Sequence, residues 1–358
     1  MEAVEFAEKN IASTALFAFN SNIDYICRVD SRFGDADFPE ELEPLLVSIM
    51  RGEAGEFKIS KRTAEWIGET FRWRERRMGG QAGIMANAAA ALGVRAFAYA
   101  AALSNEQEEL FSRDVAVLGK RTTESSRHFV FEFKKGTKVM GARIPSSNRV
   151  IATYDPANFN LRISKEFVRE SLRIAPSLEC AVISGFHNLD LRVAGSRIAT
   201  VRQLLHAWRK ENPSIRIHLE LGCFSNKTVL RKTLGALLPE ANSIGMNERE
   251  AADVIAVMGM DEGRLGELAD EIIVHEAHGS TIYGNNRRAS AVKAALFGHA
   301  LAAYKAVMGR DASFAALKRF LRKRRPLFRF KGVPAIKVEP RFTVGLGDTF
   351  AAGFALVK

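Results

Sequence analysis

The sequence predicts an α/β fold in which helices cover both faces of a mostly parallel central sheet, joined by a small β-rich lid domain. Two observations support the larger part of this prediction. Short apolar runs alternate with longer helical stretches along most of the 358 residues. Most of these runs are short and apolar, which is typical of strands in a sheet covered on both faces; residues 215–222, with polar residues on one face, are the exception. A third observation, two segments that break this rhythm, predicts the lid.

The elements of the larger domain follow one another in a regular order. Ligands in such sheets bind beyond the carboxyl ends of the strands, so the loops that follow each strand are where we look for a site. The expected strands cover residues 13–19, 95–103, 180–186, 215–222 and 271–277, and the expected helices cover residues 83–93, 193–211 and 294–309.

The lid is predicted from two strand-like segments. Residues 20–30 form a strand directly after the first one, and residues 128–139 read as a hairpin because Lys135-Gly136 separates two alternating runs. A lid suits group transfer because it excludes water from the reacting groups. We therefore assign residues 20–76 and 126–150 to the lid, and residues 1–19, 77–125 and 151–358 to the larger domain.

The composition is that of an ordinary globular protein with a basic surface. Hydrophobic residues make up 47% and charged residues 26%, and the net charge is +11. Basic residues gather at Arg72–Arg77 and Lys318–Arg325, but no nucleic-acid-binding module accompanies them. We expect no nucleic-acid partner: a solvated helix face explains the second cluster better than a DNA site, and a general positive potential that steers phosphorylated substrates into a cleft is a third possibility.

Cysteine content and hydropathy bear on the compartment. Cys27, Cys180 and Cys223 are scattered without a C-x-x-C pair, which fits a reducing compartment. The first ten residues are acidic, unlike a secretory signal, and no apolar run is long enough to cross a bilayer. We expect a cytoplasmic protein without a membrane partner, present as a monomer or small homo-oligomer.

Gly345, Leu346, Gly347 and Asp348 stand between an apolar, strand-like run and the last helical stretch. Glycines allow backbone N–H groups to approach a bound group, and a helix N-terminus attracts anions. An acid at such a place is unexpected unless it is a base that deprotonates a hydroxyl attacking a phosphate. The alternative is that Asp348 only caps the helix.

Two further segments supply carboxylates. On a strand, Glu220 shares a face with Arg216 and His218, so Glu220 could hold a magnesium-bound water; the alternative is an edge strand with one wet face. Asn247 and Glu250 are three apart at an expected helix start. They form either a capping box or a pair that reaches a hydrated metal or donor phosphates.

Two segments suggest an acceptor site. Gly79 and Gly80 precede an Ala-rich helix and permit close approach of a ligand, although tight helix packing explains them as well. Asn22 and Asp24 share a strand face, and a carboxylate beside an amide commonly binds sugar hydroxyls; an Asn/Asp turn is the alternative.

Together these stretches resemble the archaeal ADP-dependent glucokinase/phosphofructokinase family of the ribokinase-like superfamily, and the chain is similar to a shortened member. The resemblance covers most of the chain in order and is specific because several motifs recur together. It is carried by "FNSNID", "MGGQAGIMAN", "RHFVFEF", "IHLELG", "SIGMNERE", "IIVHEAHGSTIYG" and "TVGLGDTF".

The resemblance implies a role for each matching residue. Asp348 matches the catalytic base and Gly345 to Gly347 the anion hole. Glu220 and Glu250 match the positions that organise Mg²⁺ or another divalent cation, which Asp348 joins. The acceptor motifs contain Asn22, Asp24, Gly79, Gly80, Gln81 and His128, and the nucleotide side contains Asn247, His278 and Tyr283.

The function implied is transfer of the β-phosphoryl group of ADP to a hydroxyl of a sugar or sugar phosphate, with release of AMP. Fructose 6-phosphate and glucose are the favoured acceptors; Arg149 and other basic lid residues favour a phosphorylated one. The segment 251–271 is short and "HEAHGST" departs from the family wording. An ATP-dependent ribokinase-like kinase of another sugar, nucleoside or polyol therefore stays open as the alternative. A binding protein without turnover is disfavoured by Asp348 and both glutamates.

Overall fold

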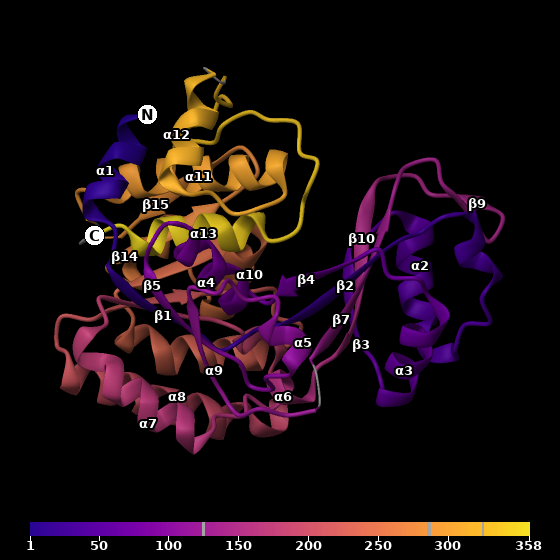
Figure 1. Cartoon of the computed structure of the whole chain (residues 1–358), viewed down its shortest axis with the longest axis horizontal. Helices are drawn as coiled ribbons and strands as arrows, with labels where there is room; N and C mark the ends of the chain where they lie inside the picture. The colour runs from indigo at the N-terminus through magenta and orange to yellow at the C-terminus, as the bar shows by residue number, and fades with distance from the viewer. Residues whose placement is uncertain (124–125, 285–287, 324–325) are drawn as a thin grey trace.

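The computed structural model describes residues 1–123, 126–284, 288–323 and 326–358. The larger domain has a sheet between two layers of helices, and the smaller domain stands to one side with its own sheet and helices (Figure 1). In the described part of the chain, no helix is long and apolar enough to cross a membrane.

The large sheet is mostly parallel, which confirms the predicted fold class. Its strand order is β16-β15-β14-β13-β12-β11-β1-β5-β6, and only β15 and β16 run antiparallel to their neighbours. The strands are β1 (Thr14–Ala18), β5 (Arg95–Tyr99), β6 (Val115–Leu118), β11 (Cys180–Ile183), β12 (Arg216–Glu220), β13 (Ser243–Asn247), β14 (Glu271–His275), β15 (Gly279–Tyr283) and β16 (Val333–Pro334).

Helices cover both faces of this sheet and bury a hydrophobic core on each (Figure 1). One layer contains α1 (Glu2–Asn10), α4 (Gln81–Ala91), α11 (Ala291–Met308), α12 (Phe314–Arg322) and α13 (Leu346–Leu356). The other contains α7 (Lys165–Ile174), α8 (Leu191–Glu211), α9 (Lys227–Leu237) and α10 (Glu248–Met258), with short helices α5 (Asn105–Glu108) and α6 (Pro156–Phe159) in connecting segments.

The smaller domain is a five-stranded sheet in the order β3-β10-β7-β2-β4. Its aromatic core packs against two helices. The predicted boundaries at 76/77 and 150/151 fall inside β4 and β10, and the division of the chain stays a prediction. The elements are β2 (Asn22–Arg28), α2 (Glu43–Arg51), β3 (Gly55–Lys58), α3 (Lys61–Thr70), β4 (Glu75–Gly79), β7 (Arg127–Phe133) and β10 (Asn148–Tyr154).

The predicted hairpin at 128–139 is wrong. β7 pairs with β2 and β10 as a central strand, and the turn at Lys135-Gly136 leads instead into a small ladder of β8 (Lys138–Val139) and β9 (Ala142–Arg143). The reason is that Phe129, Phe131 and Phe133 pack into the lid core, so β7 needs long partners on both sides.

Two other sequence interpretations are corrected. β12 lies between β11 and β13, so the edge-strand interpretation of Glu220 fails. Residues 341–344 form no strand before Gly345, because this segment crosses toward the lid: Arg77 lies over the ring of Phe342, 5.0 Å from its centroid, and Arg149 approaches Thr343. The basic cluster Lys318–Arg325 ends outside the described residues.

Candidate active site

Two cavities meet at the start of α13. The polar cavity, of about 240 Å³, lies between the lid and the carboxyl end of the large sheet and includes Gly345 and Asp348. The apolar cavity, of about 380 Å³, lies within the larger domain and includes Leu346 and Gly347. Residues 345–348, which stand out in the sequence, therefore form the boundary between the two cavities.

The backbone at this junction is arranged to present N–H groups. Gly345 is the N-cap of α13 and has φ +71°, a left-handed conformation that a side chain would strain. In the described residues no side chain caps this helix start. Asp348 lies in the first turn without acting as the cap, so the capping alternative loses its structural basis.

Asp348 lies among other acids. Burial, and then the negative charge of Glu220, raise the pKa of Asp348 to about 6, and Asp24 adds to the effect. A carboxylate with its pKa near the working pH is suited to accept a proton from an alcohol. The positive charge of Lys305 lowers the pKa of Asp348, but the Lys305 ammonium is already paired with Asp311 at 3.0 Å.

Glu220 is held by two histidines, His218 on the same strand β12 and His275 on β14, two strands away. His218 Nε2 lies 3.0 Å from Glu220 Oε2, and His275 Nε2 lies 3.4 Å from Glu220 Oε1. Burial alone raises the pKa of Glu220, but these hydrogen bonds lower it overall and keep the carboxylate ionised. Gly245 on β13 makes room for the Glu220 carboxylate, since a Cβ at this position would lie 2.0 Å from Glu220 Oε2.

Glu250 completes the capping box predicted at the start of α10. Its Oε2 accepts the backbone N–H of Asn247 at 2.9 Å, and the Asn247 side chain accepts from the backbone of Glu250. Burial, opposed by the hydrogen bond from the Asn247 backbone and helped by the negative charge of Glu220, raises the pKa of Glu250 to about 7. The two glutamates therefore lie within electrostatic reach of each other.

The polar cavity brings together the predicted acceptor-side residues. Asn22 Nδ2 donates to Asp24 Oδ1 at 2.7 Å, and both side chains are buried. Burial raises the pKa of Asp24, while His128 on the paired strand β7 lowers it. The predicted residues that line this cavity are Asn22, Asp24, Gly80, Gln81, His128, Arg149, Gly345 and Asp348.

Gly79 packs directly against the side chains of Asn22 and Asp24. A Cβ at Gly79 would lie 2.1 Å from Asp24 Oδ1 and 2.3 Å from Asn22 Nδ2, so glycine is needed for the pair to adopt its position. Among the described residues, Asn20 Oδ1 and Asn22 Oδ1 are buried acceptors without a hydrogen-bond partner, and both residues line the cavity. Such acceptors suit a ligand rich in hydroxyl groups.

Of the predicted nucleotide-side residues, Asn247 and His278 line the apolar cavity. Its walls are mostly small or apolar, and the rings of His278 and Phe328 lie 4.4 Å apart between centroids. Tyr283 is not among the described residues that line it; its hydroxyl is 3.4 Å from Glu262. The apolar walls include Ala302, Ala303, Ala306, Phe328, Ala335, Ile336, Val338, Pro340 and Phe350.

Comparison with known proteins decides the family. A conserved region described as "ADP-specific Phosphofructokinase/Glucokinase conserved region" matches residues 14–283. The chain belongs to this family. The predicted family membership is therefore confirmed.

Relatives within the ADP-specific phosphofructokinase/glucokinase family include proteins named as glucose kinases and proteins named as phosphofructokinases. An ADP-dependent glucose/glucosamine kinase of Pyrococcus abyssi is 30% identical over 299 residues, which span 73% of this chain and 64% of that protein. An ADP-specific phosphofructokinase of the same organism is 26% identical over 320 residues, spanning 75% and 68%. The chain thus spans slightly less than two thirds of the first of these two relatives.

Solved structures agree on the fold. A structure described as a hypothetical ADP-dependent phosphofructokinase from Pyrococcus horikoshii OT3 superposes with a TM-score of 0.80 at 22% identity, covering 97% of this chain and 98% of that one. An ADP-dependent kinase in complex with fructose-6-phosphate and ADPbetaS gives 0.80 at 21% identity, covering 99% and 95%.

Several cavity residues of this family member escaped the sequence reasoning, among them Asn20 with its buried Oδ1. Glu56, His187 and Asn188 line the polar cavity, and His275 joins the apolar cavity to Glu220. His275 had a detectable signal, since it is a polar residue that directly follows the apolar residues 272–274 at the end of β14. Glu56 had none, because it stands in a short strand within a charged segment.

A divalent cation fits the carboxylates in one particular way. The oxygens of Glu220 and Glu250 already accept hydrogen bonds from His218, His275 and Asn247. No group of three or more His, Cys, Asp or Glu side chains in the described residues is arranged to ligate a metal directly. Oxygen donors that are already hydrogen-bonded suit Mg²⁺ that keeps its waters, since Mg²⁺ takes few carboxylates and dehydrates reluctantly.

Proposed function

We propose that the protein is an ADP-dependent sugar kinase. It transfers the β-phosphoryl group of ADP to a hydroxyl of a sugar or sugar phosphate and releases AMP. The observation that carries the proposal is that residues 345–348 lie between the two cavities, with Asp348 facing the polar cavity and Gly347 the apolar cavity. The fold and the family membership support the same assignment.

The nucleotide occupies the apolar cavity in this proposal. Apolar walls and the Phe328 ring suit a flat adenine base, and Asn247 lies at the same cavity. The transferring phosphoryl group lies at the start of α13, where the N–H groups of residues 345–347 stabilise charge on its oxygens.

The acceptor occupies the polar cavity. Asp24 and Asn22 bind its hydroxyls and orient one of them toward Asp348. Asp348 takes the proton of that hydroxyl as its oxygen attacks the phosphorus, and AMP leaves with the electrons of the broken bond. Glu220 and Glu250 would hold Mg²⁺, and the ion would neutralise phosphate charge when bound.

Acceptor choice is set by two opposite charges in the polar cavity. Arg149 on β10 suits the phosphate of fructose 6-phosphate, whereas Glu56 on β3 suits a hydroxyl and repels a phosphate. Arg149 also reaches Thr343 Oγ1 at 3.5 Å, beside the junction. Both groups line one space, so we infer that glucose and fructose 6-phosphate are the acceptors to compare.

The test is an activity matrix with purified protein. ADP and ATP are each combined with glucose, fructose 6-phosphate, ribose and adenosine in the presence of Mg²⁺, and AMP or ADP release is measured. We expect turnover with ADP and one of the first two acceptors. Turnover with ATP alone, or only with ribose or adenosine, would contradict the proposal.

We also infer a cytoplasmic protein that is a monomer or small homo-oligomer. The free thiols of Cys27, Cys180 and Cys223 support the reducing compartment of this proposal.

A further inference from the structure

A third cavity, of about 720 Å³, lies at the amino ends of the parallel strands, on the opposite edge of the sheet from the junction at residues 345–348. Arg216 and Ser243 are the first residues of β12 and β13, and Glu271 is the first of β14. Each of these strands ends at the active site, in Glu220, Asn247 and His275 respectively. Ligands of parallel sheets normally bind at the other edge, so a large charged cavity here calls for an explanation.

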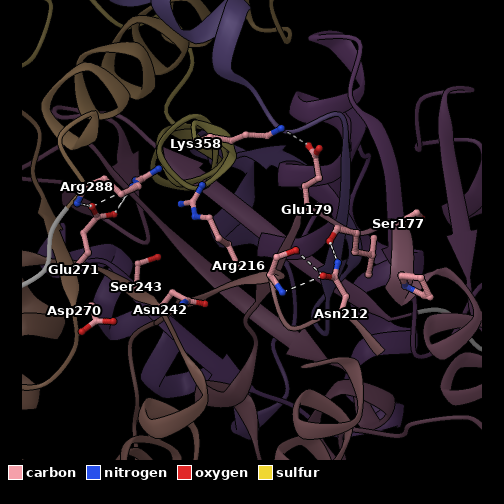
Figure 2. A pocket seen from close by; sticks show the side chains of 13 residues that line it. Ser177, Glu179, Asn212, Arg216, Asn242, Ser243, Asp270, Glu271, Arg288 and Lys358 are labelled. Atoms are coloured by element: carbon pink, nitrogen blue, oxygen red, sulfur yellow. Dashed lines mark hydrogen bonds and ion pairs between the residues drawn. The ribbon is translucent and has the colours of Figure 1, made fainter. Parts of the chain in front are cut away.

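Two arginines in this cavity point toward the end of α13 (Figure 2). Arg216 donates to the carbonyl of Val357 at 2.8 Å, and Arg288 donates to the same carbonyl and to that of Phe354 at 3.3 Å. Both cations thus lie at the carboxyl end of the helix whose other end carries Asp348. This location favours positive charge through the helix dipole.

Two of the three carboxylates that line this cavity are paired with cations other than Arg216. Arg288 binds Glu271 with two nitrogens, at 2.9 and 2.7 Å. Glu179 accepts from Lys358 at 2.8 Å and from the backbone of Ser13 at 2.6 Å (Figure 2 shows the Lys358 contact). Asp270 also lines the cavity and adds a negative charge at its rim. Among the described residues, no carboxylate lies within ion-pair distance of Arg216.

Arg216 therefore has unused capacity for an anion. A guanidinium has five N–H donors, and within the described part of the chain only one hydrogen bond of Arg216 joins it to an acceptor, the Val357 carbonyl. Burial lowers the pKa of Arg216 and the neighbouring Arg288 lowers it further, while Cys180 and Glu271 act in the opposite direction without reversing the shift. Asn242 also lines the cavity; its Oδ1 accepts from Arg209 and from the backbone of Ile217, so among the described residues its Nδ2 is a further donor at this site.

We propose that this cavity is a binding site for a small oxyanion, the phosphate or carboxylate group of a metabolite, recognised by the guanidinium of Arg216. The planar fork of arginine binds either group with two parallel hydrogen bonds. The site is separate from both cavities at the junction, and it does not depend on the proposed kinase activity, because binding is measured without turnover.

The experiment is a thermal-melting titration with inorganic phosphate, and in a second arm with citrate, against sodium chloride of equal ionic strength. All proteins carry Arg149→Gln, which removes the cation of the polar cavity. We expect phosphate, citrate or both to raise the Tm of this background beyond the chloride control. Adding Arg216→Gln should weaken the apparent affinity about tenfold or more, since a charge-assisted hydrogen bond is lost. Adding Arg319→Gln, at an exposed position of α12, should leave it unchanged.

Arg216→Lys provides a variant that keeps the positive charge beside the Val357 carbonyl. It should bind the anion several-fold more weakly than the background because the planar fork is gone. Each Tm shift is compared with the same variant in chloride, so a change in basal stability cancels. The anion that gives the larger Arg216-dependent shift identifies the recognised group. An equal shift with and without Arg216→Gln, or no shift beyond chloride with either anion, would overturn the proposal.

Discussion

The polar and apolar cavities meet at the same four residues but are built from different materials. The polar cavity is walled by both domains and by ionisable or amide side chains, including Asp24, Glu56 and Arg149. The apolar cavity is walled by the larger domain alone, mostly by alanine, branched aliphatic and aromatic residues. In the proposed function, the first selects its ligand by directed hydrogen bonds, and the second by shape and burial of a flat surface.

This difference predicts how each cavity fails. A change in the polar cavity alters which acceptor binds, or stops the chemistry, because each side chain has a specific partner. A change in the apolar cavity should alter nucleotide affinity alone. The following variants test that separation, from the largest expected effect to the smallest.

Asp348→Asn should have the largest effect. The amide cannot take the proton of the attacking hydroxyl, so kcat should fall by about 10²–10⁴-fold, while acceptor and ADP affinities change little. Steady-state kinetics with binding measurements check this. A variant with near wild-type turnover would remove Asp348 from the chemistry.

Glu220→Gln and Glu250→Gln should each raise the Mg²⁺ concentration for half-maximal rate by about 10- to 100-fold, because in the proposed function both carboxylates would hold the same ion. The measurement is a magnesium titration at saturating substrates. Glu211→Gln, at the exposed end of α8, is the matched control. Unchanged magnesium dependence in both variants would place the ion elsewhere.

Arg149→Ala should raise KM for fructose 6-phosphate by about tenfold or more and leave kcat nearly unchanged, because the sugar phosphate is remote from the reacting hydroxyl. KM for glucose should stay constant. Arg143→Ala is the control, since Arg143 is an exposed lid arginine outside the polar cavity. Equal effects of the two substitutions would argue for general lid charge.

Ala302→Phe should have the smallest effect. The larger side chain narrows the apolar cavity from α11, so KM for ADP should rise by roughly tenfold or less with acceptor KM unchanged. Ala315→Phe, at an exposed position of α12, controls for added hydrophobic bulk. An acceptor effect as large as the nucleotide effect would mean that the cavities are not separate in function.

The same contrast explains what the sequence could reveal. The strands and helices of the larger domain follow from their periodicity, and Asn22, Asp24 and the Gly345–Asp348 segment stand out because polar or glycine residues interrupt apolar runs. The apolar cavity gives no such signal: the alanines of α11 that line it look the same as those in the core. The pairing of β7 with β10 was also hidden, since 14 residues (134–147) separate two strands that local turn chemistry cannot register.

The pH dependence of kcat tests the central claim, that Asp348 is the base at the junction, most directly. With its pKa raised to about 6, Asp348 is ionised and active above that pH and protonated and inactive below it. Wild-type kcat should therefore fall about tenfold per pH unit below pH 6. Asp348→Asn should lack this limb at its low residual rate, and the Glu250→Gln variant should keep it. The same acid limb in Asp348→Asn and in wild type would contradict the account.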